Sequence, residues 1–139
     1  MASPRPRRLP IRTAPDHDPR RRVILIVDDD EDVRETFADA LRFEGYTVQA
    51  VCNGEEALAR LRAEPGARWL VVLDLMMPVM DGEVFLAHRS RDPVLSRIAV
   101  ILVTAGGDCR ELRAKHEVAG CLPKTAPLSV LVAAIEACA

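Results

Sequence analysis

Three aspartates are the first candidates for chemistry in this chain, because each follows a run of apolar residues. Residues 23–27 lead directly into Asp28 and Asp29, and residues 71–73 lead into Asp74. Short apolar runs of this kind are typical of strands that are buried on both faces of a parallel sheet. Because such sheets bind ligands at the carboxyl ends of their strands, the three carboxylates are candidates for one shared site.

Repulsion among these carboxylates indicates what a shared site would contain. At an effective dielectric of about 20, two like charges roughly 4 Å apart repel by about 4 kcal/mol. Three of them would therefore take up a proton or a cation. Carboxylate oxygens are hard ligands, and a site with few of them suits Mg²⁺, which keeps several waters and often a substrate phosphate. The three aspartates thus predict a site for Mg²⁺ and phosphate.

Helix capping is the alternative role for acids that follow a strand. We expect Asp30, Glu31 and Asp32 to be the N-cap and first turn of the next helix. The same role is open for Asp28 and Asp29. It is weaker for Asp74, because the Leu-Met-Met-Pro that follows cannot form the first turn of a helix.

Strand-like and helix-like segments alternate five times after residue 22. The expected strands are 23–27, 46–51, 69–74, 98–103 and 120–122. Apolar residues at helical spacing mark the helices between and after them, except for a mostly charged and weak fourth helix near 108–118. These marker residues are Val33, Phe37, Ala40 and Leu41; Ala57, Leu58 and Leu61; Val84, Phe85 and Ala87; and Leu128, Leu131, Val132 and Ile135.

Strict β-α alternation predicts an α/β fold, a five-stranded parallel sheet with five helices on its two faces. The expected arrangement is doubly wound and flavodoxin-like, with strand order 2-1-3-4-5, so the crevice lies between the first and third strands. Asp28, Asp29 and Asp74 would meet at its mouth. The fold inferred from periodicity therefore brings together the three aspartates that were singled out as candidates for chemistry.

Thr104 and Lys124 follow the fourth and fifth expected strands. Taken separately, a threonine there is usually a turn or cap residue, and a lysine is usually solvated. Taken with the acids, they form an anion site, in which a metal, a hydroxyl and an ammonium surround the Asp74 carboxylate. No serine, cysteine or histidine nucleophile is placed to compete with it.

Composition favours a single domain at 23–139 and a separate tail at 1–22. The chain has 139 residues, of which 49% are hydrophobic, and no apolar stretch approaches the 18 residues or so of a membrane span. We expect no membrane association and a cytoplasmic protein. The four cysteines contain no C-x-x-C pair and fit neither a disulfide framework nor a zinc site, so we expect reduced thiols.

The tail and the domain carry opposite charges. Residues 1–22 contain seven arginines, two aspartates and five of the ten prolines, for a net charge of +5, whereas the remainder carries −7. We expect this Pro/Arg-rich tail to be disordered. Nucleic acid or an anionic surface is disfavoured as its partner, because the tail has no aromatic residues and contains two acids. The alternatives are a solubilising leader and a transit peptide.

The motifs together resemble the receiver domain of bacterial two-component response regulators, of the single-domain kind found in chemotaxis regulators. The resemblance covers about 23–137. It is carried, in order, by Ile-Val-Asp-Asp-Asp at 26–30, Leu-Asp-Leu-Met-Met-Pro-Val-Met-Asp-Gly at 73–82, Val-Thr-Ala at 103–105 and Leu-Pro-Lys at 122–124.

This resemblance implies that Asp74 is the phosphoacceptor, taking a phosphoryl group from a sensor histidine kinase or a histidine phosphotransfer protein. Asp28 and Asp29 would hold Mg²⁺ together with Asp74 and the backbone carbonyl of Met76. Lys124 would pair with the phosphoryl oxygens, and Thr104 would move to hydrogen-bond one of them.

Three departures from the family bear on output rather than on phosphorylation. Cys121 stands three positions before the lysine, where the family commonly has an aromatic residue that rotates on activation. Thr125 follows the lysine in place of a proline with a cis bond, and the interval from Thr104 to Lys124 is about two residues short. We therefore expect intact acceptor chemistry and an unusual conformational response.

The function expected from the sequence is that of a stand-alone receiver, because the chain ends with the fifth helix. It would be no enzyme beyond self-phosphorylation and slow autodephosphorylation, would not bind DNA directly, and would signal by binding an unknown downstream protein; a homodimer is left open. The first alternative is a constitutive adaptor with the receiver fold and no regulated phosphorylation. The second is a Mg²⁺-dependent phosphohydrolase resembling haloacid dehalogenases, which is disfavoured because Met76 stands where such enzymes carry a second acid.

Overall fold

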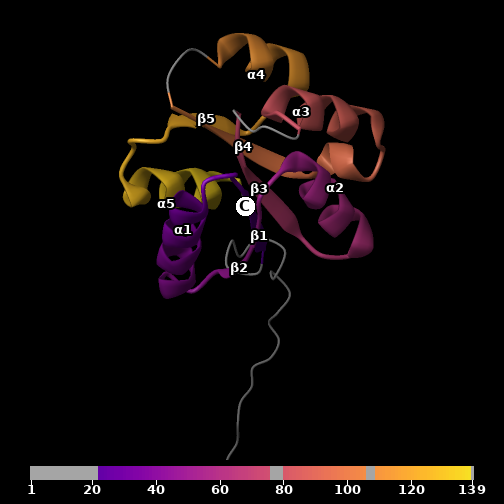
Figure 1. Cartoon of the computed structure of the whole chain (residues 1–139). Coiled ribbons are helices and arrows are strands. Elements are labelled where there is room, and N and C mark those ends of the chain that lie inside the picture. Colours follow the sequence, from indigo (N-terminus) through magenta and orange to yellow (C-terminus); the bar gives the residue numbers. More distant parts are fainter. Residues whose placement is uncertain (1–21, 76–79, 106–108, 139) are drawn as a thin grey trace, which may run out of the picture.

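Five parallel strands form one sheet in the order β2-β1-β3-β4-β5, in a computed structural model that describes residues 22–75, 80–105 and 109–138 (Figure 1). This confirms the predicted α/β fold and strand order. Residues 1–21 of the tail expected at 1–22 lie outside the described residues. The strands are β1 (Val23–Val27), β2 (Thr47–Val51), β3 (Trp69–Asp74), β4 (Ala99–Thr104) and β5 (Gly120–Pro123).

Helices connect successive strands and cover both faces of the sheet. They are α1 (Glu31–Phe43), α2 (Gly54–Ala63), α3 (Gly82–Arg91), α4 (Arg110–His116) and α5 (Leu128–Ala137), with a short 3-10 helix, η4 (Leu95–Arg97), before β4. Figure 1 shows α1 and α5 on one face, and α2, α3 and α4 on the other. No helix among the described residues is both long and apolar enough to cross a bilayer.

Alternating side chains of the central strands supply both halves of the core. In β1, Ile24 and Ile26 pack into the cluster under α1 and α5, whereas Leu25 and Val27 pack into the cluster under α2, α3 and α4. All four are at most 1% exposed. A strand that is apolar at every position is therefore buried on both faces, as the continuous apolar run predicts.

The structure differs from two expectations about side chains. On α3, the marker residue Val84 is 44% exposed, while Phe85 and Leu86 are fully buried. The helix turns Val84 outward, because its buried face runs through residues 82, 85, 86 and 89 instead. The expectation of four reduced thiols is also wrong for one pair, since Cys109 and Cys121 are joined as a disulfide, while Cys52 and Cys138 are free.

A buried arginine on α3 fixes the end of α4. Arg89 is 6% exposed, and its guanidinium donates hydrogen bonds to the carbonyls of Ile98 (3.0 Å), His116 (2.8 Å) and Glu117 (3.4 Å). The last carbonyls of a helix have no partner within the helix, so an arginine there satisfies groups that would otherwise be buried unpaired. Arg89 thereby joins α3, the start of β4 and the C-terminus of α4.

Replacing Arg89 by Met should lower the free energy of unfolding by about 2–4 kcal/mol, because the replacement leaves buried carbonyls without donors. Urea denaturation measures this loss. The matched control is Arg91→Met at the exposed end of the same helix, for which we expect a change within about 0.5 kcal/mol. Equal losses for the two variants would contradict the assigned role of Arg89.

Candidate functional site

The register of the sheet places the candidate residues side by side at its carboxyl edge. Val27 of β1 pairs with Leu73 of β3, so the residues that follow them, Asp28 and Asp74, lie level with one another. Continuing across the sheet, Asp74 pairs with Val103 of β4, the neighbour of Thr104. Thr104 pairs in turn with Pro123 of β5, and Lys124 comes next. Strand pairing alone therefore sets the order Asp28, Asp74, Thr104 and Lys124 along one edge.

Three carboxylates of this edge are close enough to share one cation. Asp28, Asp29 and Asp74 each offer an oxygen that lies within 4.8 Å of those offered by the other two. Asp28 and Asp74 are each 3% exposed, whereas Asp29 is exposed. The cluster is thus buried on the sheet side and open to solvent through Asp29.

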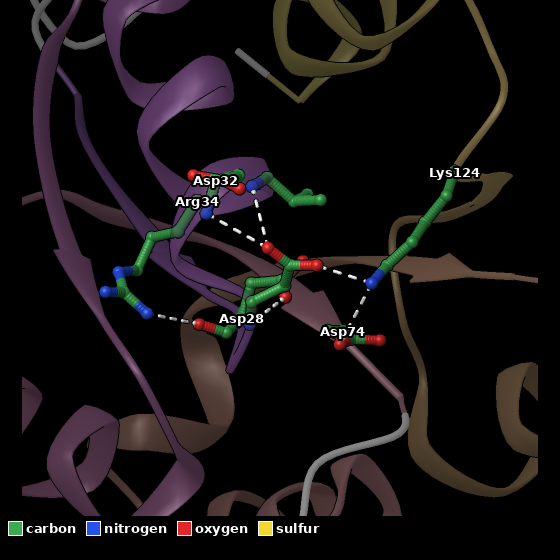
Figure 2. Close-up of polar contacts among 7 residues, drawn as sticks. Asp28, Asp32, Arg34, Asp74 and Lys124 are labelled. Atoms are coloured by element: carbon green, nitrogen blue, oxygen red, sulfur yellow. Dashed lines mark hydrogen bonds and ion pairs between the residues drawn. The ribbon is translucent and has the colours of Figure 1, made fainter.

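The ammonium of Lys124 lies between two of these carboxylates. Its Nζ is 3.1 Å from Oδ2 of Asp74 and 3.3 Å from Oδ2 of Asp28 (Figure 2). Burial opposes the charge on Lys124, but the hydrogen bond to Asp74 and the negative charges of Asp28 and Asp74 outweigh it and raise the pKa of the ammonium. Lys124 therefore remains a cation at neutral pH and is the positive partner of the cluster.

Local contacts sort the acids that follow β1 into two roles. Asp30 is the N-cap of α1, and its carboxylate accepts from the backbone N–H groups of Asp32 and Val33. Its own N–H donates to Oδ1 of Asp28 at 2.9 Å, which orients that carboxylate toward the cluster. The predicted capping role thus holds for Asp30, while Asp28 and Asp29 face the site.

Arg34 is a supporting residue that the sequence analysis missed. Its guanidinium donates to the backbone carbonyl of Asp28 at 2.9 Å (Figure 2). This hydrogen bond attaches α1 to the end of β1, in addition to the backbone that connects them. An arginine on the polar face of a helix is usually solvated, and no spacing or motif marks this one. Only the packing of α1 against the sheet shows its role.

A close backbone approach closes the connection that follows Asp74. The N–H of Gly82 donates to the carbonyl of Leu75 at 2.9 Å, and a Cβ on Gly82 would lie 2.8 Å from Cα of Leu75. Any side chain at residue 82 would therefore push the two backbones apart. Met76, the predicted carbonyl ligand, lies within this connection but outside the described residues.

Thr104 ends β4 beside the carboxylates. It is 7% exposed, and its carbonyl accepts from the N–H of Lys124 at 2.8 Å. The predicted hydroxyl and ammonium residues are thus tied together through their backbones. Their roles toward a bound anion stay predictions.

The charges of the cluster favour a divalent cation. Three carboxylates against the single ammonium of Lys124 leave two negative charges unbalanced, which is the charge that Mg²⁺ would offset. The donor set, all carboxylate oxygens and partly open to water, suits a hard cation that keeps some of its waters. The described residues therefore fit the metal predicted from the sequence.

Replacing Lys124 by Met should destabilise the metal-free protein by about 1–3 kcal/mol at pH 7, because it leaves two buried carboxylates without their cation. Urea denaturation in a chelating buffer measures the loss. The matched control is Lys115→Met, since Lys115 also lies 3.1 Å from a carboxylate, that of Glu83, but both of those side chains are more than half exposed. We expect the control to lose less than about 1 kcal/mol; a control loss as large as that of Lys124→Met would contradict the assignment.

Comparisons with known proteins agree on one family. Residues 24–136 match the model of the response regulator receiver domain. The response regulator MprA of Mycobacterium ulcerans is 40% identical over 119 residues, which cover 82% of this chain and 48% of MprA. The transcriptional regulatory protein CpxR homolog of Haemophilus influenzae is 34% identical over 116 residues, which cover 82% of this chain and 48% of that relative. The chain thus spans about half the length of these curated relatives.

A solved structure supports the same fold. The chemotaxis protein CheY4 of Vibrio cholerae superposes with a TM-score of 0.75 over 84% of this chain and 97% of CheY4, at 24% sequence identity. At that identity the likeness concerns the fold alone. Because the family model spans nearly all of the described sheet and helices, the chain belongs to the response regulator receiver domain family.

Proposed function

We propose that this receiver accepts a phosphoryl group on Asp74 and signals through a change in its protein-binding surface. The observation that carries the proposal is the setting of the Asp74 carboxylate. It is buried at the tip of β3, lies 3.1 Å from the Lys124 ammonium, and shares a cluster with two further carboxylates. Receiver domains bind Mg²⁺ at such an acidic cluster, and family membership implies a histidine kinase or another phosphodonor as the partner.

The chain's own residues account for most of the chemistry. A carboxylate oxygen of Asp74 would attack the phosphorus atom while the bond to the donor's leaving group breaks, so that the phosphoryl group passes to Asp74. Lys124 already touches Asp74 and would turn to the phosphoryl oxygens, whose added negative charge attracts it. Mg²⁺ bound by the aspartates would neutralise charge on the transferring group.

Thr104 would respond to that new charge. It ends the strand next to Asp74 and shares a backbone hydrogen bond with Lys124. The threonine hydroxyl would donate to a phosphoryl oxygen, which gives the phosphorylated state a contact that the free state lacks. A differential contact of this kind is what biases an equilibrium between two conformations.

Output by protein–protein binding is the second part of the proposal. The CpxR homolog is named a transcriptional regulatory protein, and this chain matches about half of its length. We propose that the matched part acts through a partner protein rather than through direct contact with DNA. In this proposal the receiver is cytoplasmic, and it turns over phosphate only through slow loss from its own Asp74.

Incubation with acetyl phosphate and Mg²⁺ should add one phosphoryl group to the chain, because acetyl phosphate supplies a good leaving group for attack by Asp74. Intact-mass spectrometry detects the adduct. Asp74→Asn should abolish uptake, since an amide oxygen is a far poorer nucleophile. The matched control is Asp32→Asn, an exposed acid in the first turn of α1, which should take up phosphate like the unaltered chain.

The outcomes of this experiment separate the candidate functions. Uptake by Asp74→Asn at the level of the unaltered chain would show that another residue is the acceptor. No uptake by any variant would favour a constitutive adaptor. Multiple turnover of the phosphate donor, without a stable adduct, would favour a phosphohydrolase.

Mg²⁺ should stabilise the protein, because it binds the folded cluster and not the unfolded chain. At about 100 times the dissociation constant, the expected gain is about 2.7 kcal/mol. Asp29→Asn should raise the dissociation constant about tenfold or more, since it removes a charged ligand candidate, while Asp32→Asn should leave it unchanged. Thermal unfolding at several Mg²⁺ concentrations measures both effects, and equal affinities for the two variants would remove Asp29 from the metal site.

A further inference from the structure

Two cysteines that lie far from the acidic cluster in sequence meet next to α4. Cys109 is the N-cap residue of α4 and Cys121 is the second residue of β5, and the structure joins their sulfur atoms. Their Cα atoms are 6.3 Å apart, within the range of about 4.4–6.8 Å that a disulfide spans. We propose that Cys109 and Cys121 form a reversible thiol–disulfide site that attaches the start of α4 to β5 when it is oxidised.

The surroundings of the two thiols differ in a way that suits a reversible bond. Cys109 is 5% exposed and belongs to the apolar cluster under α2, α3 and α4, whereas Cys121 is only partly buried against that cluster. Cys121 pairs with Leu102 of β4, a member of the same cluster, so its side chain faces α4. Reagents in solvent therefore reach Cys121 first, and Cys109 is positioned to react with it next.

The exchange needs a disulfide oxidant, such as glutathione disulfide. The Cys121 thiolate attacks one sulfur of the oxidant, which breaks its S–S bond and releases one thiol. The Cys109 thiolate then attacks the Cys121 sulfur and releases the second thiol. The protein gives up two electrons and two protons, and the oxidant is reduced to two thiols. A dithiol reductant reverses both steps.

The bond would change how α4 is held. Arg89 fixes the C-terminal end of α4 through the carbonyls of His116 and Glu117, in either redox state. At the other end, Cys109 makes no side-chain cap hydrogen bond, and the attachment to β5 is the disulfide. The oxidised protein therefore has a covalent link from the start of this seven-residue helix to β5, whereas in the reduced protein the start of the helix is held by packing alone.

The consequence for signalling rests on the proposed function. Cys109 follows Thr104 by five residues, and Cys121 precedes Lys124 by three, so the bond joins the segments that carry these two site residues. An oxidised receiver would still accept phosphate on Asp74, because neither cysteine belongs to the acidic cluster. It would transmit less of the resulting change to α4.

Thiol counting on the full chain tests the bond. After treatment with glutathione disulfide, removal of the oxidant and alkylation in denaturant, we expect two alkylated cysteines in place of the four found in the reduced chain, with peptide mapping linking Cys109 to Cys121. The matched control, Cys52→Ser with Cys138→Ser, should still form the bond, whereas Cys121→Ser and Cys109→Ala should not. A linkage between other cysteines, a linkage between chains, or four alkylated cysteines after oxidation would overturn the proposal.

Two further measurements test the attachment of α4. Oxidation should raise the melting temperature of the unaltered chain by roughly 5–10 °C, because it closes a loop in the unfolded state, and should slow amide exchange in α4 by about tenfold or more. Unchanged amide exchange in α4 would overturn the attachment.

Acetyl phosphate is then added to both redox forms. A lack of phosphate uptake by both redox forms would contradict the proposed function and leave the mapped bond standing. Phosphate uptake by a protein in which oxidation forms no Cys109–Cys121 bond would contradict the redox site alone.

Discussion

The crowding of three carboxylates at one edge of the sheet is the constraint on which the rest of this structure depends. Nothing in folding favours placing Asp28 and Asp74 level with one another in a buried setting, since like charges repel there more strongly than in water. The apolar strands that carry them supply the stability that makes the placement tolerable. Lys124 offsets part of the charge, and in the proposed function the remainder gives the site both its affinity for a cation and its response to a phosphoryl group.

The same sheet separates a rigid part of the molecule from one that is attached more loosely. β1, β3 and β4 are buried and extensively paired, and β1 and β3 carry the acids at their carboxyl ends. α4 is a short helix, and its attachments include Arg89 at its end, Cys109 at its start, Leu112 packed against the core and Lys115 on its exposed surface. Elements with few attachments are those that move at low cost. In the proposed function, a change at Asp74 would therefore be transmitted to α4.

Patterns along the chain predict this fold well, because β1, β3 and β4 are continuous apolar runs and a polar residue ends or directly follows each of them. The bounds of β1 and β3 agree with the sequence. Those of β2 and β5 differ by one residue at one end, and those of β4 differ by one residue at each end. The face of α3 is harder to predict, since Val84, Phe85 and Leu86 are all apolar and only packing decides which of them turns outward. Contacts between residues that are distant in the sequence cannot be predicted from such patterns. Arg34, Arg89 and the pair Cys109–Cys121 are recognisable only once helices lie against the sheet.

Cys121 matters both as a departure in the sequence and as a contact in the folded chain. The family resemblance leads one to expect an aromatic ring at this position, and its absence predicts an unusual conformational response. In the folded chain, however, the small side chain lets β5 approach the start of α4 closely enough for a covalent bond to Cys109. A ring that rotates between two positions restrains its surroundings by packing, whereas a disulfide restrains them by a covalent bond until that bond is reduced. If the bond forms as proposed, coupling between Asp74 and α4 would depend on the redox state of the surroundings as well as on phosphate, and the departure from the family would be a second input rather than a defect.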